Sequence, residues 1–225
     1  MISITNLETF GWESAIRGMR NPYNSWAKSD SYFDSGEYET EPKDDYIINH
    51  SYTDFYIGKS DLELMQKLIS GGPVHSKFLR MLIISCDVIA PLYWWKEFDT
   101  YKVGTVANSC STMHTIHKKE FELYDFSFEN VSDDVPGIIF GGLDAIVDML
   151  NKARELYLKT NNKKYWYSII QMLPSSYNQK RTIIFNYEVL RNIYKWRKDH
   201  KLDEWRDFCT MMVARIPYGK ELITT

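Results

Sequence analysis

The stretch of sequence best equipped for chemistry runs from residue 91 to residue 114. A group of aromatic residues comes first, and a group of small or polar residues follows it. The aromatic residues are Trp94, Trp95, Phe98 and Tyr101, and the small or polar residues are Gly104, Thr105, Asn108, Ser109, Cys110, Ser111 and Thr112. Rings provide flat apolar walls, and hydroxyl and amide groups provide hydrogen-bonding partners, so the pattern suits a flat ligand with polar edges. The alternative is a core helix followed by a capped turn, and for the stretch taken alone this alternative is favoured.

A second candidate for ligand binding is the segment 182–198, which we predict to be a helix. In a helix Asn186, Leu190, Ile193 and Arg197 share one face, because steps of four, three and four residues return to the same side. Asn186 and Arg197 would then lie about 16 Å apart at the ends of an apolar strip. Such an amide and guanidinium would suit an extended ligand. The alternative, favoured by the periodicity alone, is a core-facing helix whose polar ends reach water.

Isolated histidine and cysteine residues give weaker indications. His75 follows a Gly-Gly-Pro turn and is placed to touch a ligand, although a single loop histidine is more often structural or solvated. His114 and His117 are three residues apart, but no neighbouring carboxylate or cysteine completes a metal site. Cys110 has no recognisable base beside it, so a turn residue is the better interpretation than a nucleophile. We expect no metal.

Length and composition are those of one globular domain covering residues 1–225. Apolar residues make up 44% of the chain and charged residues 25%, and the net charge is −3. This charge provides no general attraction to nucleic acid or to an anionic membrane, so we expect neither as a partner. Aromatic content is high, at 15% with 16 Tyr and 7 Trp. Such residues suit oligomer interfaces and ring-stacking sites equally well.

The cysteines and the N-terminal segment indicate a reducing compartment. Cys86, Cys110 and Cys209 are widely spaced and show no C-x-x-C motif, so neither a disulfide framework nor a zinc site is expected. The first twenty residues lack a charged leader followed by an apolar run. No apolar stretch reaches the length that spans a bilayer. We therefore expect a cytoplasmic protein.

The pattern of elements predicts an α+β fold, with a central, mostly antiparallel sheet flanked by helices and a helical C-terminal third. Residues 28–60 are expected to include a long acidic surface loop, since Lys28 to His50 show little periodicity. Asp61 is expected to cap the helix that follows. The expected strands are Ile2–Ile4, Phe78–Ala90 and Glu120–Phe128, and the expected helices are Trp12–Arg20, Asp61–Ser70, Leu143–Lys159, Tyr165–Met172, Thr182–Lys198 and Leu202–Arg215.

Motifs spread over nearly the whole chain carry a family resemblance. The segment LPSSYNQKRTIIFNYEVLRNIYKWRKDHKLDEW contains a Leu-Pro pair, Asn186, Asn192 six residues later, Arg197 and Asp199. Upstream, AIRGMR forms an A-x-R-x-x-R pattern, and GGPVHSKFLRMLIISCDVIAPLYW contains a glycine turn, a long apolar run and a proline. In this order and at this spacing, the chain resembles the flavin-dependent thymidylate synthases, the ThyX family.

The resemblance implies a fold, an activity and an assembly. Members of the family are homotetramers that hold FAD between subunits and stack deoxyuridine monophosphate (dUMP) on the flavin ring. They methylate C5 of the uracil, with methylenetetrahydrofolate as carbon donor and NADPH as reductant. The resemblance implies that Asn186, Asn192, Lys102, Tyr101 and His75 contact the flavin. It implies that Asn108, Ser111 and Arg197 contact the substrate, and that Arg197 and Ser111 are the catalytic residues.

The central stretch departs from the family pattern, which is R-H-R, then seven residues, then the serine of N-E-x-S-x-R-Y; here one residue is inserted between the two parts. Thr100, Tyr101 and Lys102 fall on R-H-R, so only Lys102 keeps a charge. Met113 falls on the arginine of the ending, and Ile170 falls on a second family arginine. A phosphate site without these arginines lacks bidentate partners.

We therefore expect flavin binding to be retained better than dUMP binding. The leading functional hypothesis is an FAD-dependent methyltransferase acting on a uracil nucleotide, either dUMP or a related pyrimidine. The alternative is a non-catalytic relative that keeps the fold for ligand sensing or assembly.

Overall fold

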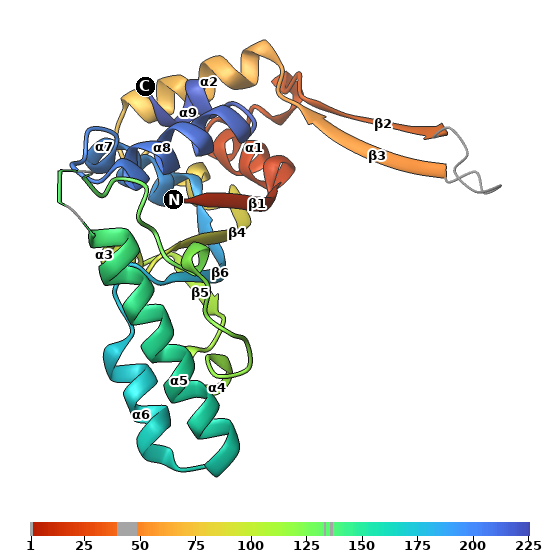
Figure 1. Ribbon diagram of the computed structural model, residues 1–225. Helices are drawn as coiled ribbons and strands as arrows, with labels where there is room; N and C mark the ends of the chain where they lie inside the picture. Colours follow the sequence, from red (N-terminus) through yellow and green to blue (C-terminus); the bar gives the residue numbers. More distant parts are fainter. Residues whose placement is uncertain (1, 40–48, 133, 136) are drawn as a thin grey trace.

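A four-stranded antiparallel sheet forms the centre of the computed structural model, which describes residues 2–39, 49–132, 134–135 and 137–225 (Figure 1). The strand order is β1-β4-β6-β5, so β1 and β5 are the two edges. The strands are β1 (Ser3–Phe10), β4 (Ile83–Pro91), β6 (Asn178–Asn186) and β5 (Thr105–Ser109). Burial alternates along β4, where Ile84, Cys86 and Val88 are buried and the residues between them are partly or fully exposed. One face of the sheet is therefore covered by the core and the other is open.

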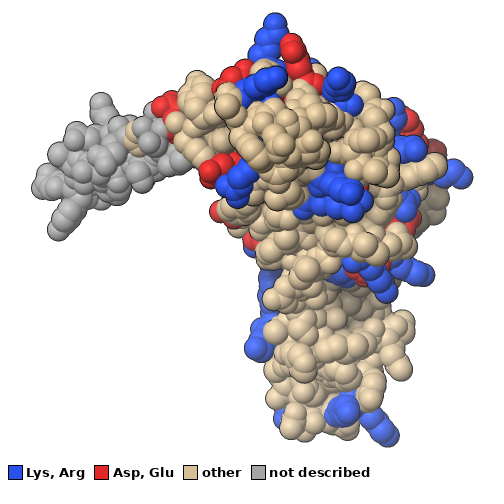
Figure 2. Space-filling model, turned by 180° about the vertical axis from the view of Figure 1, so that it is seen from behind, with Lys and Arg blue, Asp and Glu red and all other residues tan. Residues whose placement is uncertain are grey.

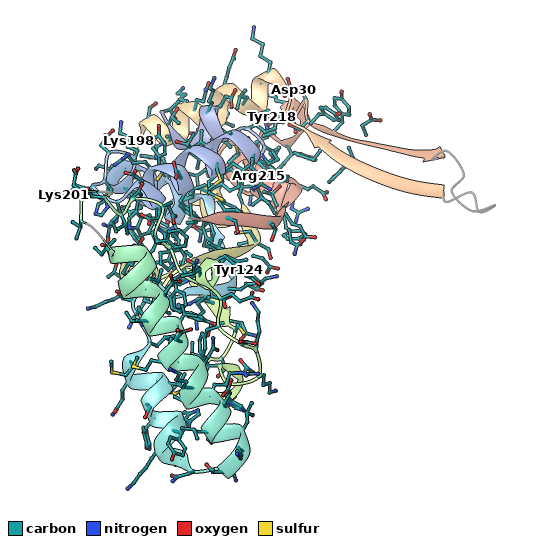
Figure 3. The ribbon with its side chains drawn as sticks, viewed as in Figure 1. Asp30, Tyr124, Lys198, Lys201, Arg215 and Tyr218 are labelled. Carbon is teal, nitrogen blue, oxygen red and sulfur yellow. The ribbon has the colours of Figure 1, made fainter. Side chains whose placement is uncertain are left out.

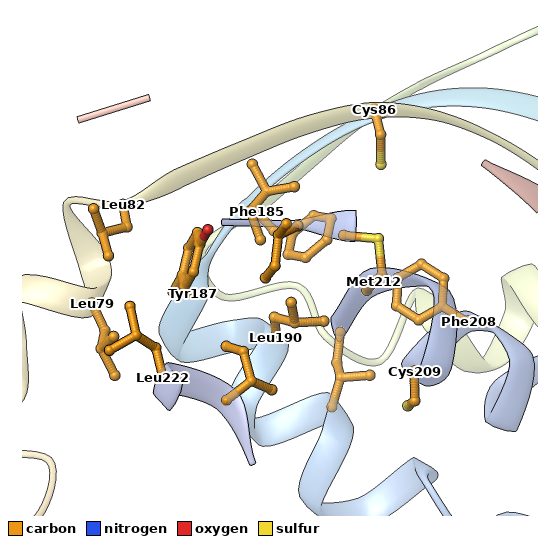
Figure 4. Close-up of a cluster of buried hydrophobic side chains, with 14 of the residues drawn as sticks. Leu79, Leu82, Cys86, Phe185, Tyr187, Leu190, Phe208, Cys209, Met212 and Leu222 are labelled. Carbon is orange, nitrogen blue, oxygen red and sulfur yellow. The ribbon is translucent and has the colours of Figure 1, made fainter. Parts of the chain in front are cut away.

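Helices from both ends of the chain cover the buried face. Figure 1 shows α1, α2, α7, α8 and α9 together on one side of the sheet. The helices are α1 (Trp12–Arg20), α2 (Lys59–Ser70), α3 (Leu92–Phe98), α7 (Tyr187–Arg197), α8 (Asp203–Arg215) and α9 (Gly219–Ile223). Figure 4 shows part of the core that they enclose, in which Cys86 and Phe185 from the sheet lie with Leu190 of α7 and Met212 of α8. Burial of these apolar side chains is the main force that holds the helices on the sheet.

A helical hairpin forms an arm that projects away from the sheet (Figure 1). It consists of α5 (Asp144–Thr160) and α6 (Lys163–Met172), and α4 (Thr112–Thr115) lies alongside it, where the backbone carbonyl of Met113 accepts the indole N–H of Trp166 at 3.2 Å. The arm has a small core of its own, made of Ile116, Phe121, Phe126, Val147, Leu150 and Ile169. Single turns complete the described elements: 3-10 turns at Asn21–Tyr23, Trp26–Lys28, Lys77–Arg80 and Leu123–Asp125, and a π-helical turn at Ile138–Leu143.

A two-stranded hairpin projects from the opposite side of the molecule. It consists of β2 (Tyr32–Glu39) and β3 (Asn49–Tyr56). The rings of Tyr32 and Tyr56 stack at its base with centres 5.5 Å apart. The backbone N–H of Ile57 donates to the hydroxyl of Tyr218 at 2.8 Å, and Figure 3 shows Tyr218 beside the start of the hairpin. The hairpin is thus anchored on the last helices of the chain.

This hairpin corrects the prediction of an acidic surface loop across residues 28–60. Cross-strand aromatic pairs give these strands their register, and polar side chains hide the alternation from sequence analysis. Residues 40–48, which also belong to the predicted loop, lie outside the described residues. The start of α2 also differs from the prediction. The helix begins at Lys59, and Asp61 is completely buried in its first turn instead of capping it.

Three further predictions about strands and helices were wrong in part. The expected strand Phe78–Ala90 begins only at Ile83, because residues 77–80 form a 3-10 turn. The expected strand Glu120–Phe128 is a 3-10 turn and a single bridge between Phe126 and Tyr177. The expected helix Thr182–Lys198 is the end of β6 followed by α7. The fold class is confirmed, as are α1 and, to within two residues at each end, α5, α6 and α8.

The helices of the described part of the chain do not include a membrane span. None of its helices combines the length and the apolar character that crossing a bilayer requires.

Candidate functional site

The aromatic cluster that begins at Trp94 belongs to the core. Trp94 and Trp95 are completely buried, and Phe98 is 2% exposed. The ring centre of Trp94 lies 4.6 Å from that of Trp205 and 5.3 Å from that of Phe208, both on α8. These rings join α3 to α8, and they are not the walls of a ligand cavity. The interpretation as a core helix is correct for this part of the stretch.

Arg197, at the C-terminal end of α7, lies in a polar cluster. Its Nε donates to the hydroxyl of Tyr101 at 3.0 Å, and its Nη1 donates to Glu97 Oε2 at 2.6 Å. Nη1 also lies 2.8 Å from His200 Nε2, and the guanidinium carbon lies 4.8 Å from the centre of the Trp205 ring. The Arg197 side chain is 18% exposed. Its Nη2 makes no hydrogen bond to any residue that the structure describes, so this nitrogen is the donor left for a ligand.

Sequence analysis missed the residues that hold Arg197. Glu97 Oε2 accepts a second hydrogen bond from Trp205 Nε1 at 3.1 Å. Glu97 and Arg197 are 100 residues apart in the chain, so no local spacing connects them. Only the packing of α3 against α7 and α8 brings the carboxylate to the guanidinium.

Asn186 is the last residue of β6 and the N-cap of α7. Its Oδ1 accepts the backbone N–H of Val189 at 3.0 Å. This capping contact explains why strand gives way to helix at this position. The amide Nδ2 faces the loop before β5, since a Cβ built on Gly104 would lie 3.3 Å from it and 3.1 Å from a methyl group of Val189. Gly104 also has a φ of +79°, a conformation that favours glycine, and the close approach leaves little room for a side chain.

The remaining predicted residues of the central stretch follow the exposed edge of the sheet. Lys102 and Asn108 are exposed, and neither forms a side-chain hydrogen bond with a residue in the described ranges. Asn108 lies on β5, opposite Thr182 of β6. Because β5 is an edge strand, the backbone groups on its outer side have no strand partner. Side-chain and backbone donors are therefore both available along this edge.

Ser111 follows β5 and caps the short helix α4. Its hydroxyl accepts the backbone N–H of His114 at 3.2 Å. It also lines a cavity of about 370 Å³ with Cys110, Tyr177 and Lys180. Burial raises the pKa of the Tyr177 hydroxyl, so this wall of the cavity remains a neutral donor. In the described part of the chain, no hydrogen bond or ion pair joins Ser111 to Arg197.

Two predicted contacts lie on or near α7 but apart from its capping residue. Asn192 is exposed, and six residues along the helix place it on a different side from Asn186. His75 is exposed in the turn after α2. That turn leads to Arg80, whose guanidinium forms an ion pair with Glu188 in the first turn of α7.

We refer to the predicted positions on and around β5 together as the β5-edge site. Its residues are Tyr101, Lys102, Asn108, Ser111, Asn186 and Arg197. The structure brings Tyr101 to Arg197 and the Gly104 loop to Asn186, whereas His75 and Asn192 lie beside the site. No group of His, Cys, Asp and Glu among the described residues is arranged to hold a metal ion.

Comparison with known proteins gives the fold a class. No family model and no curated protein matches the chain. Among solved structures it has the fold of the flavin-dependent thymidylate synthases. One similar structure is thymidylate synthase X (ThyX) from Helicobacter pylori with FAD and dUMP, with a TM-score of 0.69, 18% identity, and 99% of this chain and 97% of that chain covered. Another structure of ThyX from the same organism, also with FAD and dUMP, matches with a TM-score of 0.64 and 18% identity. The match covers 97% of this chain and 98% of that chain.

Proposed function

We propose that this protein binds FAD and catalyses the reductive methylation of a uracil nucleotide, dUMP or a related pyrimidine. The observation that carries the proposal is the match over the whole chain to the fold of proteins that hold FAD and dUMP. The contact of Tyr101 with Arg197 and the approach of the Gly104 loop to Asn186 support it. NADPH as reductant and methylenetetrahydrofolate as carbon donor belong to the same proposal.

The residues of the β5-edge site are compatible with FAD. A flavin ring presents carbonyl and nitrogen atoms at its edge, and FAD carries an anionic pyrophosphate. The Nδ2 of Asn186 and the whole side-chain amide of Asn108 are available to bond the flavin, since neither group forms a hydrogen bond with a described residue. Lys102 offers an exposed cation for the pyrophosphate. When bound, FAD supplies the transfer of hydride.

The chain itself contributes position and charge. Glu97 and Tyr101 fix the guanidinium of Arg197, and Nη2 remains free to donate to a pyrimidine carbonyl. A fixed cation at that point stabilises negative charge that develops on the ring. Ser111, whose oxygen already accepts from a backbone N–H, can still donate its own proton to the nucleotide.

We further propose that the protein is a homotetramer in which the β5-edge site is completed by a neighbouring chain. Apolar side chains are exposed on the open face of the sheet, at Phe10, Ile89, Val106 and Ile184, and on the arm, at Met149, Leu156, Leu158, Tyr167 and Met172. Figure 2 shows that the arm carries few charged side chains along most of its length on the face in view. Exposed apolar side chains gathered on two parts of the molecule are consistent with interfaces between chains.

The cytoplasm is the compartment that we propose. Cys86, Cys110 and Cys209 are free thiols, which fits a reducing environment.

A specific observation supports a second candidate, a non-catalytic relative that binds a ligand without turnover. Met113, at the position of a family arginine, is 51% exposed and brings no cation to the site. Ile170, at the other arginine position, packs against the core of the arm.

Two measurements separate these candidates. The visible spectrum of the protein, incubated with FAD and then freed of unbound FAD by gel filtration, tests cofactor binding, because flavin that stays with the protein absorbs in the blue. Formation of thymidylate from dUMP, with NADPH and methylenetetrahydrofolate present, then tests catalysis. Bound flavin without product would support the non-catalytic relative, and absence of bound flavin would contradict the first proposal.

A further inference from the structure

A second cavity lies at the base of the β2–β3 hairpin, at the opposite edge of the sheet from the β5-edge site. Its volume is about 340 Å³. It lies between α1, which follows the edge strand β1, and the first residues of β2. The residues that line it are Glu13, Ile16, Arg17, Arg20, Trp26, Ser29, Ser31, Tyr32, Phe33 and Phe55. A cavity of this size is in the range that binds small molecules.

Aromatic rings form much of the wall and are held in place. Trp26, Tyr32 and Phe33 are 50%, 59% and 52% exposed, so their faces are accessible. The indole nitrogen of Trp26 donates to Asn21 Oδ1 at 2.7 Å, and the ring centre of Phe33 lies 4.8 Å from that of Phe55. Exposed aromatic rings with fixed orientation suit a flat apolar group.

The back of the cavity is formed by Arg20, which is buried in an ion pair with Asp61, and other residues of the chain supply the hydrogen-bond partners of both groups. Arg20, 3% exposed, donates through Nε to Asp61 Oδ1 at 2.6 Å and through Nη2 to Ser60 at 3.1 Å. Asp61 Oδ2 accepts from the hydroxyls of Ser29 and Ser31, at 2.6 and 2.7 Å. These groups have their partners within the chain. They make the wall rigid and leave little hydrogen-bonding capacity for a ligand.

The carboxylate of Asp30 ties this wall to α2. It accepts the backbone N–H groups of Ser60 and Asp61, at 2.8 and 3.1 Å, and Figure 3 shows Asp30 at the base of the hairpin. A Cβ on Gly58 would lie 2.2 Å from the Asp30 side chain, so this contact requires glycine at position 58. The cavity is therefore preformed.

Arg17 is the cation with spare capacity. Its side chain is 64% exposed, and its one ion pair with a described residue is a 3.9 Å contact to Glu13, also exposed. Exposed pairs of this kind are weak, so an anionic ligand can compete for the guanidinium. A guanidinium beside aromatic walls recognises a flat ring that carries a carboxylate or a phosphate.

We propose that this cavity binds a planar aromatic anion, with its ring between Trp26 and Phe33 and its anionic group on Arg17. The cavity is separate from the β5-edge site, so the proposal does not depend on the flavin function.

Calorimetric titration with quinaldate, a planar bicyclic carboxylate, tests the proposal, and its neutral amide quinaldamide serves as the matched ligand. No FAD is added, because FAD is itself a planar aromatic anion and would compete for this cavity, and the Arg17→Gln variant distinguishes the cavity from the β5-edge site. We expect quinaldate to bind about tenfold more tightly than quinaldamide, as one charge-assisted contact implies. Arg17→Gln should remove this difference, and Trp26→Ala should weaken both ligands.

Arg206→Gln is the control variant, because Arg206 is an exposed arginine on α8 that pairs with Asp203 away from the cavity. It should bind both ligands like the unaltered protein. Circular dichroism of each variant checks the fold, and both cavity variants change exposed side chains. No binding at millimolar ligand, a preference for quinaldate that survives in Arg17→Gln, or unchanged affinities in Trp26→Ala would each overturn the proposal.

Discussion

The guanidinium of Arg197 makes its shortest contact with the carboxylate of Glu97, at 2.6 Å. We expect Glu97→Gln to lower the free energy of unfolding by about 1–2 kcal/mol, because a charge-assisted bond is lost but both side chains are partly screened by water. Urea denaturation measures this change. Glu8→Gln is the control, since Glu8 is exposed on β1 and forms no ion pair with a described residue. Equal losses in the two variants would contradict a special role for Glu97.

Met113 stands where the ThyX family has an arginine, and we propose that this position governs the binding of a nucleotide phosphate. We expect dUMP to bind weakly, because neither Met113 nor Ile170 supplies a cation. Met113→Arg should then strengthen dUMP binding by about tenfold or more, since one charge-assisted contact is restored. Deoxyuridine should bind both proteins alike, as it has no phosphate. Calorimetric titration of the FAD-loaded proteins measures the four affinities, and tight dUMP binding by the unaltered chain would show that other residues hold the phosphate.

Asp87, on the open face of the sheet, makes stability depend on pH. Hydrogen bonds from Lys180, Thr182 and Asn6 lower the pKa of its carboxyl from 3.8 to about 2. A carboxyl with a lowered pKa in the folded state stabilises the protein above its unfolded pKa, and this contribution disappears as the pH falls toward about 2. Asp87→Asn should therefore be less stable than the unaltered protein near neutral pH, and the difference should shrink below about pH 4. Urea midpoints over this pH range measure it, and a constant difference would contradict the assignment.

Among single residues, the sequence indicates the members of the β5-edge site better than their partners. Lys102, Asn108 and Ser111 follow each other along one stretch, so a motif can identify them. The contact between Tyr101 and Arg197 spans 96 residues, and only the folded core brings the two together. No pattern of residue types along the chain contains that information.

At the scale of elements, substitutions of Asn186 at the junction between β6 and α7 can test its capping role and its proposed role in FAD binding separately. Asn186→Ser keeps a side-chain acceptor for the N-terminus of α7 but removes the amide donor that faces Gly104. We expect it to reduce FAD binding by about 1–3 kcal/mol with little change in stability. Asn186→Ala should reduce both, with a loss of about 0.5–2 kcal/mol in the free energy of unfolding.

Flavin fluorescence titration and urea denaturation measure the two effects on the same preparations. Asn192→Leu tests the other expected flavin contact on the same helix, and it should leave stability unchanged because Asn192 is exposed and caps nothing. If Asn186→Ser keeps full FAD affinity, Asn186 has only the capping role.

The same junction shows where elements can be predicted and where they cannot. Long amphipathic helices such as α5 were predicted closely because apolar residues repeat over several turns. In the segment 182–198, apolar residues at positions 183 and 185 face the core from a strand, and those at 190 and 193 face it from a helix. Both stretches are short, so one helical period fits the whole segment and conceals the change of structure at Asn186.

At the scale of the whole molecule, exposed apolar surface is distributed over the open sheet face and the arm. Val106, on β5 of the central sheet, is 68% exposed, and Leu158, near the end of α5 in the arm, is 54% exposed. Two separate apolar surfaces allow each chain to contact more than one neighbour, which a closed tetramer requires and a simple dimer does not. The edge of the β5-edge site, with its unpaired backbone groups, would be covered in such an assembly.

Light scattering at micromolar concentration tests this assembly, and we expect a mass of about four chains of 26.6 kDa. Leu158→Asp should reduce the mass, because it places a charge in the proposed interface of the arm without disturbing the core. Lys159→Asp is the matched control: it introduces the same acid at the next, exposed position of α5, where the native residue is already charged. If the arm assembles the tetramer, Leu158→Asp should also lose FAD, since the site would no longer be completed by a neighbour. A stable monomer that binds FAD fully would contradict an intersubunit site and leave the β5 edge of a single chain to hold the cofactor alone.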